Sequence, residues 1–533
     1  MTASSATGDR RVVVVTGGGG GIGAAIATEL GRQGCFVVTV DPLVTSDGSA
    51  PLPPPEETTA GRIVAAGGAA RASSASVTDA DAVRDLFEEL VAEHGRLDAV
   101  VNAAGITRPT TFARGTEEDW REVLAVHLGG YLNVLGAALP IMAAAGHGRI
   151  LGVTSGSGWR AADAGAYGCA KRAVAALTWQ IGRQVPPGVA VNAMSPIAVT
   201  RMVTEALARA GGARGSAATG GLSLGSMPEP EQLGPLGAHL VSDDLSFSGQ
   251  VIFTAGSEVA VVDHPRLLEI VATDGAASNP HLLEAATTGA LVPAEETQAS
   301  TGGTNPRFPS AFGPPLEDLP AAAVRTCAVV AELPGLDIIV TSTLEARGVA
   351  CTSVPAEAVG TADIGAFDAV VVATAGGTRS AKGGWEGVLA EHRGLVEQIP
   401  ADAAWARAVA EASAAADRPM RLVTLIDARS AGGRSRAQAA VQLSRAARKA
   451  TGDRVAAFAV SVEGAGPDDF GGLAAHLLCS PSTPALAGAE LVAGYGWCGL
   501  RSHPHPTGSI ALAGPDLPRW FDAVLQHLVE RRP

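Results

Sequence analysis

A tyrosine and a lysine four residues apart, in the segment YGCAK, are the side chains of this sequence best suited to chemistry. On a helix, Tyr167 and Lys171 lie one turn apart on the same face. A phenol has a pKa near 10 and exchanges its proton near neutral pH only if a cation stabilises the phenolate. The strand GRILGVTS delivers Ser155 just upstream, where its hydroxyl could hold a substrate oxygen. The three side chains suit proton transfer to or from an alcohol or carbonyl oxygen.

A glycine-rich turn follows the first apolar strand, in the segment VVVVTGGGGGIG. Gly17, Gly21 and Gly23 permit a tight turn, close approach of a pyrophosphate and close packing of the next helix. The N-terminus of that helix, predicted over residues 22–33, would face the phosphates. The sequence therefore predicts a nicotinamide dinucleotide site, which would supply the hydride that accompanies proton transfer at Tyr167.

The second strand, CFVVTVD, ends in Asp41, where the adenosine ribose of the dinucleotide would lie. A carboxylate there accepts hydrogen bonds from the ribose hydroxyls and repels a 2′-phosphate, and no Arg or Lys follows until Arg62. NAD is therefore favoured over NADP. The alternative is that Asp41 only ends the strand in a turn before Pro42.

Apolar strands and amphipathic helices alternate from residue 11 to residue 262. This pattern predicts an α/β fold in which helices cover both faces of a doubly wound, Rossmann-like parallel sheet. Residues 263–320 are rich in Pro, Gly, Ser and Thr and are expected to be a linker. The alternation resumes over residues 321–533, which predicts two tandem domains. Residues 1–10 are expected to be disordered.

The composition of the chain narrows the class of partner. A length of 533 residues predicts several domains, and a formal net charge of −14 argues against a nucleic-acid surface. We find no apolar run that approaches the roughly 18 residues of a membrane span and no signal peptide, so we expect a cytoplasmic location. The six cysteines lie far apart, which predicts buried thiols and no metal site. The expected partner is a small hydroxy or oxo compound.

Five motifs occur in the order typical of the short-chain dehydrogenase/reductase family, which residues 10–262 resemble throughout. They are TGGGGGIG, NAAG at residues 102–105, Ser155, YGCAK and the NAMSP loop that ends in Pro196. The long insertion after Asp41 and the segments ITRPTTFARGTEEDWREVLAVHLGG and SPIAVTRM are similar to the 3-hydroxyacyl-CoA dehydrogenase domains of peroxisomal multifunctional enzyme type 2 and their bacterial relatives.

The resemblance implies a role for each matched residue. Tyr167 would be the acid/base, Lys171 would lower its pKa and bind the nicotinamide ribose, and Ser155 would orient the substrate oxygen. The residues that would bind the cofactor are Gly17, Gly21, Ile22, Gly23, Asp41, Asn102, Gly105, Tyr167, Lys171, Pro196 and Thr200.

Three positions depart from the family pattern. His127 stands where the family usually has a catalytic Asn, as in the multifunctional enzyme subgroup, so it is either a proton relay or a structural helix histidine. Ser155 lies twelve residues before Tyr167, one fewer than usual, which leaves Ser157 as the alternative. Ser76 replaces the Asp that commonly contacts adenine.

Four segments of the first half recur in order in the second half, which indicates an internal duplication. GGIGAAIATELGRQG matches PGLDIIVTSTLEARG, and LDAVVNAAG, WREVLAVHLGG and LGAHLVSDDLSFSGQVIFTAG have similar counterparts. The second copy has Glu332 and Asp337 at the phosphate turn, Asp427 at the position of Ser155 and no Tyr-x-x-x-Lys. We therefore expect a copy without dinucleotide binding or catalysis, even though His392 matches His127. Its expected role is to replace a partner subunit in a pseudo-dimer that could dimerise further, or else to regulate the first copy.

The sequence thus favours an NAD-dependent oxidoreductase that interconverts a secondary alcohol and a ketone, most plausibly a 3-hydroxyacyl and a 3-oxoacyl thioester. The alternative within the same class is an enzyme for a steroid, polyketide or other secondary-metabolite hydroxyl, because the substrate loop at residues 203–232 is unreadable. A protein that only senses the dinucleotide or acts as a scaffold is a third hypothesis, against which the Ser155, Tyr167 and Lys171 set argues.

Overall fold

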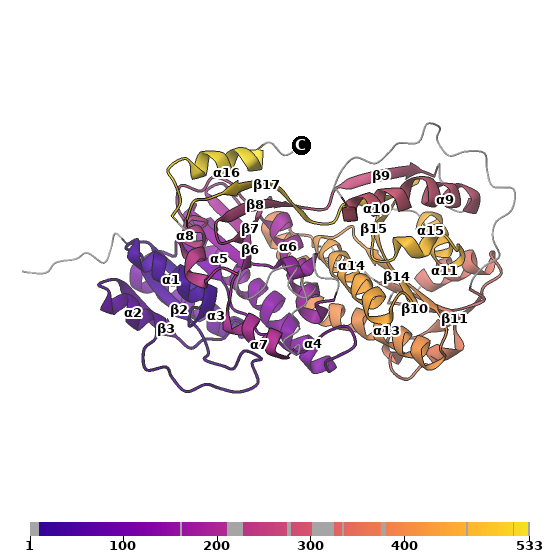
Figure 1. The fold of residues 1–533 in the computed structure, drawn as a ribbon, viewed down its shortest axis with the longest axis horizontal. Coiled ribbons are helices and arrows are strands. Elements are labelled where there is room, and N and C mark those ends of the chain that lie inside the picture. The colour runs from indigo at the N-terminus through magenta and orange to yellow at the C-terminus, as the bar shows by residue number, and fades with distance from the viewer. Residues whose placement is uncertain are drawn as a thin grey trace, which may run out of the picture.

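The computed structural model describes residues 10–159, 163–209, 227–273, 279–300, 324–332, 335–374, 380–464, 467–514 and 516–530. These residues form two α/β units that lie side by side (Figure 1). Most of the segment 1–10, for which disorder was predicted, lies outside the described residues, as does the middle of the predicted substrate loop.

The first sheet has nine strands in the order β17-β8-β7-β6-β5-β4-β1-β2-β3. The strands from β3 to β7 are parallel, and β8 and β17 continue the sheet antiparallel. The bounds are β1 Val12–Thr16, β2 Phe36–Val40, β3 Ala69–Ser73, β4 Ala99–Asn102, β5 Gly148–Val153, β6 Val189–Ile197, β7 Val251–Ala255, β8 Glu258–Asp263 and β17 His505–Ala511.

Both faces of the first sheet are covered, as the continuous apolar strand VVVVT requires. Val12 and Val14 point to a core shared with α3, α5 and α6, whereas Val13 and Val15 point to a core shared with α1, α8 and α16. The helix bounds are α1 Gly21–Arg32, α2 Thr59–Ala65, α3 Ala80–His94, α4 Glu117–Leu124, α5 Gly130–Ala145, α6 Gly165–Ile181, α7 Arg201–Arg209, α8 Gly234–His239 and α16 Phe521–Glu530.

The second sheet has eight strands in the order β11-β10-β12-β13-β14-β15-β16-β9, parallel up to β15. Its strands are β9 Leu267–Ala272, β10 Thr326–Ala331, β11 Ala350–Val354, β12 Ala369–Thr374, β13 Met420–Asp427, β14 Val455–Glu463, β15 Glu490–Gly494 and β16 Trp497–Arg501. Its helices are α9 Pro280–Ala286, α10 Val292–Ser300, α11 Leu336–Glu345, α12 Gly384–Glu391, α13 Leu395–Ala415, α14 Ala431–Thr451 and α15 Pro467–Cys479. The prediction of two doubly wound parallel sheets is confirmed.

The two sheets have the same strand order apart from β3, which has no counterpart among the described strands of the second sheet. The repeated sequence segments lie in corresponding elements, so that α1 corresponds to α11, β4 to β12, α4 to α12 and β7 to β15. This agreement supports the interpretation of an internal duplication.

The two units exchange their last strands. The chain leaves β8 of the first sheet and enters β9, which pairs with β16 of the second sheet; after β16 it returns to β17, which pairs with β8. The two crossing segments run antiparallel and are hydrogen-bonded, because Ser502 N donates to Arg266 O over 2.8 Å and Arg266 N donates to Ser502 Oγ over 3.1 Å. Figure 1 shows both crossings at the upper edge of the molecule.

This exchange corrects two expected domain boundaries. Residues 267–272 and 280–300 are not a linker but form β9, α9 and α10 of the second unit. The Pro- and Ser-rich composition suggested a linker, but some of these polar residues and prolines begin a helix: Asn279 caps α9 and Pro280 occupies its first turn. The C-terminal residues that form β17 and α16 belong to the first unit, where Ile510 and Phe521 enter its core.

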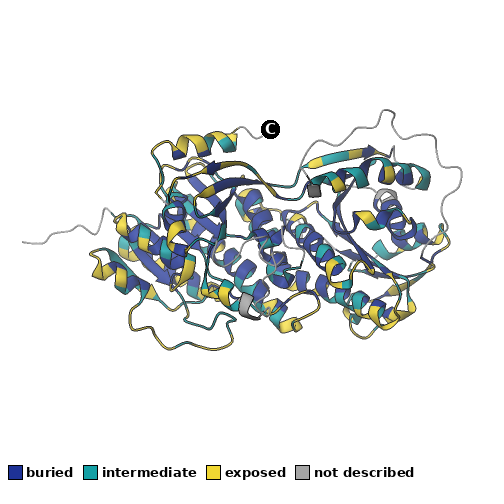
Figure 2. Cartoon of the chain, in the orientation of Figure 1, coloured by how far each residue is buried: buried dark blue, intermediate teal, exposed yellow. Residues whose placement is uncertain are grey.

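Helices α6 and α14 pack against each other at the centre of the interface between the units, with α4 against α13 beside them. Figure 2 shows these central helices as largely buried. Along α6 the partly exposed residues are Tyr167 and Gln180. Helix α6 therefore presents Tyr167 to the open edge of the first sheet while its other faces are covered.

The stretch Glu117–Ala145, which comprises α4, a π-helical turn and α5, is long and apolar enough to cross a membrane by length and composition alone. This finding corrects the expectation that no stretch approaches that length. The stretch packs against α3, α6 and α13, as a core helix does.

Candidate active site

The glycine turn after β1 has the shape that a pyrophosphate needs. Gly17 has a φ of +66°, and a Cβ added to it would lie 2.8 Å from backbone atoms of Ala103 and Ala104. A Cβ on Gly23 would lie 2.3 Å from Gly17 O, so the turn and α1 pack too closely for a side chain. Gly20 caps α1 without a side chain, and a Cβ added to it would meet no atom within 4 Å. The N-terminus of α1 is therefore open to an anion.

The surrounding loops complete this cradle. Thr200 lies over the turn, 3.5 Å from where a Cβ of Gly21 would be, and partly buried Ile22 follows on α1. Asn102 Oδ1 accepts a hydrogen bond from Thr16 Oγ1 over 2.9 Å and thereby joins the ends of β4 and β1. The predicted cofactor residues thus line the carboxyl edge of one sheet, to which Pro196 at the end of β6 also belongs. These features fit a nicotinamide dinucleotide.

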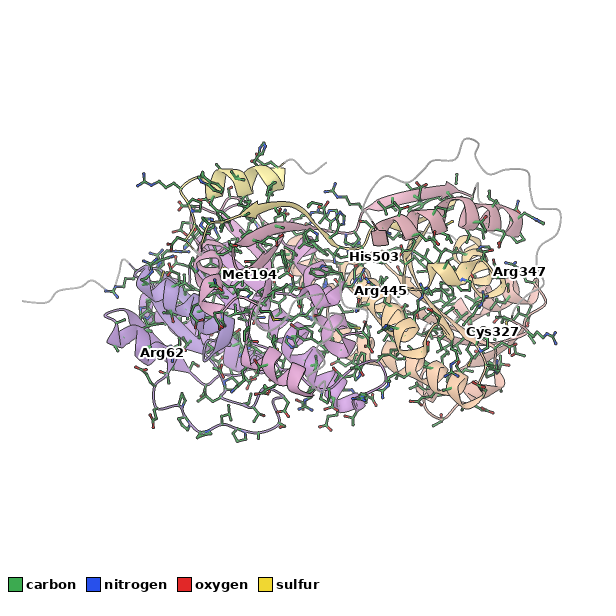
Figure 3. The ribbon with its side chains drawn as sticks, viewed as in Figure 1. Arg62, Met194, Cys327, Arg347, Arg445 and His503 are labelled. Atoms are coloured by element: carbon green, nitrogen blue, oxygen red, sulfur yellow. The ribbon has the colours of Figure 1, made fainter. Side chains whose placement is uncertain are left out.

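Asp41 lies beside the same turn but is engaged by the backbone. Its Oδ2 accepts from Gly19 N over 3.2 Å and its Oδ1 accepts from Leu43 N over 2.9 Å. Exposed Arg62, labelled in Figure 3, donates to Thr59 Oγ1 over 3.1 Å, and that hydroxyl lies 3.5 Å from Gly19 O. The fold therefore brings both a carboxylate and a guanidinium towards the adenosine end of the cradle.

Tyr167, Lys171 and Ser155 come together as the sequence predicts. The Ser155 hydroxyl lies close enough to Tyr167 to lower the pKa of the phenol, and Lys171 Nζ lies 5.6 Å from the centre of the Tyr167 ring. Lys171 Nζ also donates to Val153 O over 2.6 Å. Burial lowers the pKa of Lys171 to about 7 and raises the pKa of Tyr167, and the neighbouring Ser155 hydroxyl opposes that rise.

The structure distinguishes the two serines of the turn after β5. The hydroxyl in contact with Tyr167 is that of Ser155, whose Oγ also accepts from Ser157 N over 3.2 Å. Residues 156–158 form a single 3₁₀ turn that continues from Ser155. Ser157 therefore shapes the turn through its backbone.

His127 lies in the π-helical turn Ala125–Gly129, a geometry frequent at functional sites. Its ring is 5.1 Å from the Tyr167 ring, edge to face, and its Nε2 is 2.8 Å from Ile106 O. Burial and the charge of Lys171 lower the pKa of His127 well below its usual value, so the ring is neutral and Nε2 donates to the carbonyl. Buried Nδ1 has no hydrogen-bond partner among the described residues. A Cβ on Gly105 would lie 2.5 Å from the His127 ring, which explains the glycine there.

The insertion after Asp41, residues 42–57, crosses from the adenosine end of the cradle to the start of α7. Thr107 N donates to Ser46 O over 2.7 Å, and the Ser46 hydroxyl donates to Glu205. Arg201 Nη2 donates to Val44 O over 3.3 Å. This strap joins the loop after β4 to the helix that begins the predicted substrate loop.

At the corresponding edge of the second sheet, an ion-pair cluster takes the place of a cradle. Arg436 of α14 is completely buried and donates to Glu332 Oε1 over 2.6 Å and to Asp402 Oδ1 over 2.7 Å. Asp427 pairs with Arg429, and both ring nitrogens of buried His392 are hydrogen-bonded, to Val388 O and Ser435 Oγ. In the described part of this edge, the carboxylate of Glu332 therefore follows β10 at the place where the glycine turn follows β1 in the first unit.

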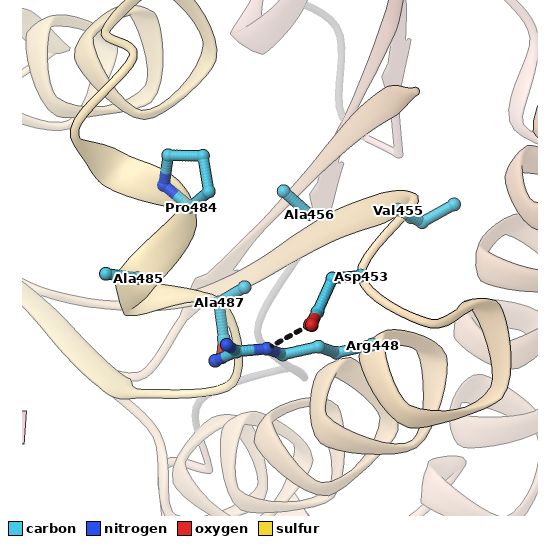
Figure 4. A pocket seen from close by; sticks show the side chains of 7 residues that line it. All are labelled: Arg448, Asp453, Val455, Ala456, Pro484, Ala485 and Ala487. Carbon is cyan, nitrogen blue, oxygen red and sulfur yellow. Dashed lines mark hydrogen bonds and ion pairs between the residues drawn. The ribbon is translucent and has the colours of Figure 1, made fainter. Parts of the chain in front are cut away.

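The second unit also has a surface pocket of about 220 Å³ at the start of β14. Arg448 Nε donates to Asp453 Oδ1 across it over 2.5 Å (Figure 4). None of the predicted site residues lines this pocket.

Sequence reasoning missed the contacts between the two units that support the Ser155 turn and α6. Arg445 of α14 donates to Trp159 O, and buried Arg172 of α6 pairs with Glu490 of β15. The available signal was Arg172, which directly follows Lys171 in an otherwise largely apolar helical segment, because a charge on a buried helix needs a partner.

A family model described as short chain dehydrogenase matches residues 11–210. The 3-oxoacyl-[acyl-carrier-protein] reductase FabG of Thermotoga maritima is 34% identical over 197 residues, which cover 34% of this chain and 75% of that protein. Short-chain reductase protein NovJ of Streptomyces niveus is 35% identical over 237 residues, 44% of this chain and 87% of that protein. Acetoacetyl-CoA reductase of Cupriavidus necator is 31% identical over 189 residues, 35% of this chain and 74% of that protein.

Proposed function

Since this chain belongs to the short-chain dehydrogenase family and is therefore an oxidoreductase, we propose that it interconverts a 3-oxoacyl and a 3-hydroxyacyl thioester. The observation that carries the proposal is the grouping of Ser155, Tyr167 and Lys171 at the edge of the sheet that holds the glycine cradle. The thioester is favoured because two of the similar proteins are named as reductases of 3-oxoacyl-[acyl-carrier-protein] and acetoacetyl-CoA.

The proposed reaction uses three side chains of the first unit. A bound nicotinamide dinucleotide supplies the hydride in reduction. Ser155 donates a hydrogen bond to the substrate carbonyl oxygen and holds it beside the phenol. Tyr167 transfers its proton to that oxygen as negative charge develops, and protonated Lys171 stabilises the phenolate that remains. Oxidation of the alcohol follows the same steps in reverse.

His127 acts in this proposal as a positioning residue or proton relay. Its neutral ring is fixed by the bond to Ile106 O, which leaves the Nδ1 lone pair as an acceptor next to Tyr167. An unpartnered buried acceptor carries a free-energy cost of about 1–3 kcal/mol unless a water molecule or ligand satisfies it. A proton path from the catalytic pair through His127 would supply that partner.

We propose NAD as the preferred cofactor. Asp41 lies within hydrogen-bond distance of Gly19 N in the cradle, where its charge disfavours a 2′-phosphate. Arg62 argues in the other direction, since an exposed guanidinium can pair with that phosphate. The carboxylate is the nearer group, since Asp41 bonds Gly19 of the turn directly, whereas Arg62 bonds Thr59, which in turn contacts Gly19 O.

The test is turnover of acetoacetyl-CoA with NADH and with NADPH by wild type, Tyr167→Phe and Ser155→Ala. We expect turnover by wild type with a higher kcat/KM for NADH, and a loss of at least about a hundredfold in kcat for Tyr167→Phe with a much smaller change in dinucleotide affinity. Turnover of cyclic or polyketide-like ketones but not of the thioester would replace the substrate class. Dinucleotide binding without turnover of any carbonyl compound would favour a sensing role.

We also propose that the second unit takes the place of a partner subunit. The support is the packing of α6 on α14 and of α4 on α13, in which equivalent regions of the two units meet. We therefore expect light scattering to give the mass of a monomer or a dimer of the full chain. A stable tetramer of chains would contradict the proposal.

A further inference from the structure

The turn that carries Ser155 is stabilised by hydrogen bonds that the backbone carbonyl oxygens of residues 155–159 accept. Inside the turn, Gly158 N donates to Ser155 O over 3.0 Å and Trp159 N donates to Gly156 O over 3.1 Å. The next three carbonyls are bound by side chains outside the turn, two of them from α14 of the second unit and one from α6 of the first unit. Ser157 O accepts from Gln442, Gly158 O from Arg172 and Trp159 O from Arg445.

Arg445 makes the shortest of these three bonds and belongs to the second unit. Its Nη1 donates to Trp159 O over 2.7 Å, whereas the Arg172 bond is 3.3 Å and the Gln442 bond is 3.5 Å. Figure 3 labels Arg445 in the region where the two units meet. Burial and the nearby charge of Arg172 lower the pKa of Arg445 to about 10, so the guanidinium stays charged at neutral pH and the bond to Trp159 O is charge-assisted.

Residues of the second unit also anchor the helix that carries Lys171. The next residue, Arg172, is completely buried and pairs with Glu490, and its Nε donates to Gln438 Oε1 over 3.0 Å. Glu490 in turn accepts from Gln438 Nε2 over 2.6 Å. The Ser155 turn and α6 are therefore fixed against the same surface, made by α14 and β15.

We propose that Arg445 is a positioning residue for the reaction, which keeps the Ser155 hydroxyl on Tyr167 by holding the Trp159 carbonyl. The second unit has thus lost its own site but contributes to the site of the first unit. The inference rests on the proposed function for its kinetic consequence. A displacement of about 1 Å of a group that orients substrate can lower turnover a hundredfold, so the loss of one fixed carbonyl is expected to be measurable.

The test compares Arg445→Met, which keeps the length of the side chain without the donor, with Arg445→Lys, which restores a donor. Arg448→Met is the matched control, since Arg448 lies one turn further along α14 and contacts Asp453 and Ala487 O. We expect Arg445→Met to lower kcat for acetoacetyl-CoA about tenfold with dinucleotide Kd unchanged within about twofold, Arg445→Lys to recover most of the loss, and Arg448→Met to match wild type.

A double variant separates positioning from general damage. If Arg445 acts through Ser155, Arg445→Met causes no further loss in a Ser155→Ala background. A further tenfold loss there, or wild-type kcat in Arg445→Met, would overturn the inference. If Arg445→Met does not fold, Gln442→Leu tests the neighbouring carbonyl and is expected to lower kcat in the same way by a smaller factor.

A readout without turnover keeps the inference separate from the proposed function. If wild type reduces no carbonyl compound, the proposed function fails. Hydrogen exchange of the peptide spanning residues 153–159 then tests whether Arg445 positions the Ser155 turn. Faster exchange in Arg445→Met but not in Arg448→Met supports positioning by Arg445. Equal exchange in the three proteins contradicts it.

Discussion

Lys171 is buried, yet the proposed reaction needs its positive charge. Its side chain is 4% exposed, and burial lowers its pKa to about 7. The hydrogen bond to Val153 O is compatible with either protonation state. Without dinucleotide, Lys171 therefore loses its proton near neutral pH, and a negative group that enters the site favours the charged form.

This shift predicts how stability depends on pH. The unfolded chain keeps Lys171 protonated up to about pH 10.4, whereas the folded protein loses that proton near pH 7. Between these values the unfolded state binds more protons, so the free energy of unfolding rises with pH. We expect wild type to gain up to a few kcal/mol relative to Lys171→Met between pH 7 and pH 10, measured by denaturant unfolding without dinucleotide. Lys382→Met, which removes an exposed lysine, is the control and should show no such trend.

The chemistry of the site could be predicted from the sequence because its residues lie in short local motifs. Tyr167 and Lys171 are four residues apart, and the glycine turn is continuous in the chain. Two features could not be predicted in this way. The bond between Arg445 and Trp159 joins residues 286 positions apart, and the contact that selects Ser155 rather than Ser157 depends on the shape of the 3₁₀ turn.

Among the elements, α6 and α14 follow corresponding strands of the two sheets but carry different buried side chains. In α6 the face towards the sheet edge carries Tyr167 and Lys171. In α14 the buried cation is Arg436, which pairs with Asp402 of α13 and Glu332 after β10. The carboxylates pull the pKa of Arg436 upward against the effect of burial, so this cluster stays charged. In the second unit, this ion-pair cluster lies at the sheet edge where the first unit has its glycine turn, which agrees with the prediction that the second unit does not bind a dinucleotide.

The cluster predicts a large cost for removing its cation. Arg436→Met would leave Asp402, which is 6% exposed, without its partner, and breaking a buried pair in this way costs about 3–5 kcal/mol. Thermal unfolding should show a clear decrease in Tm. Arg454→Met is the control, because its pair with Asp417 is exposed and worth about 0–1 kcal/mol. Equal effects of the two variants would show that the buried cluster adds nothing to stability.

Across the molecule, the exchange of last strands means that neither unit is complete within one stretch of sequence. The repeats and the alternation of elements predicted both sheets correctly, because each repeat keeps the apolar periodicity of its strands. They could not predict which sheet each last strand joins. Strands β9 and β17 are short antiparallel additions at the edges of the two sheets. The crossing segments between them have only a few residues and are hydrogen-bonded to each other through Arg266 and Ser502.

Reversing the exchange tests this account of the whole chain. His505 is paired directly with Asp263, so a two- to four-residue turn can join β8 to β17 and return residues 504–530 to the first unit. We expect a chain of residues 10–263 joined in this way to 504–530 to unfold cooperatively at a higher temperature than residues 10–263 alone. The added segment buries Ile510, Leu512, Phe521 and Leu525, each worth about 1.5–3 kcal/mol. Replacing Phe521 and Leu525 by Ser in the joined chain is the control and should remove most of the gain. If the joined chain is no more stable than residues 10–263, β17 and α16 are only a tether between the units and not part of the first core.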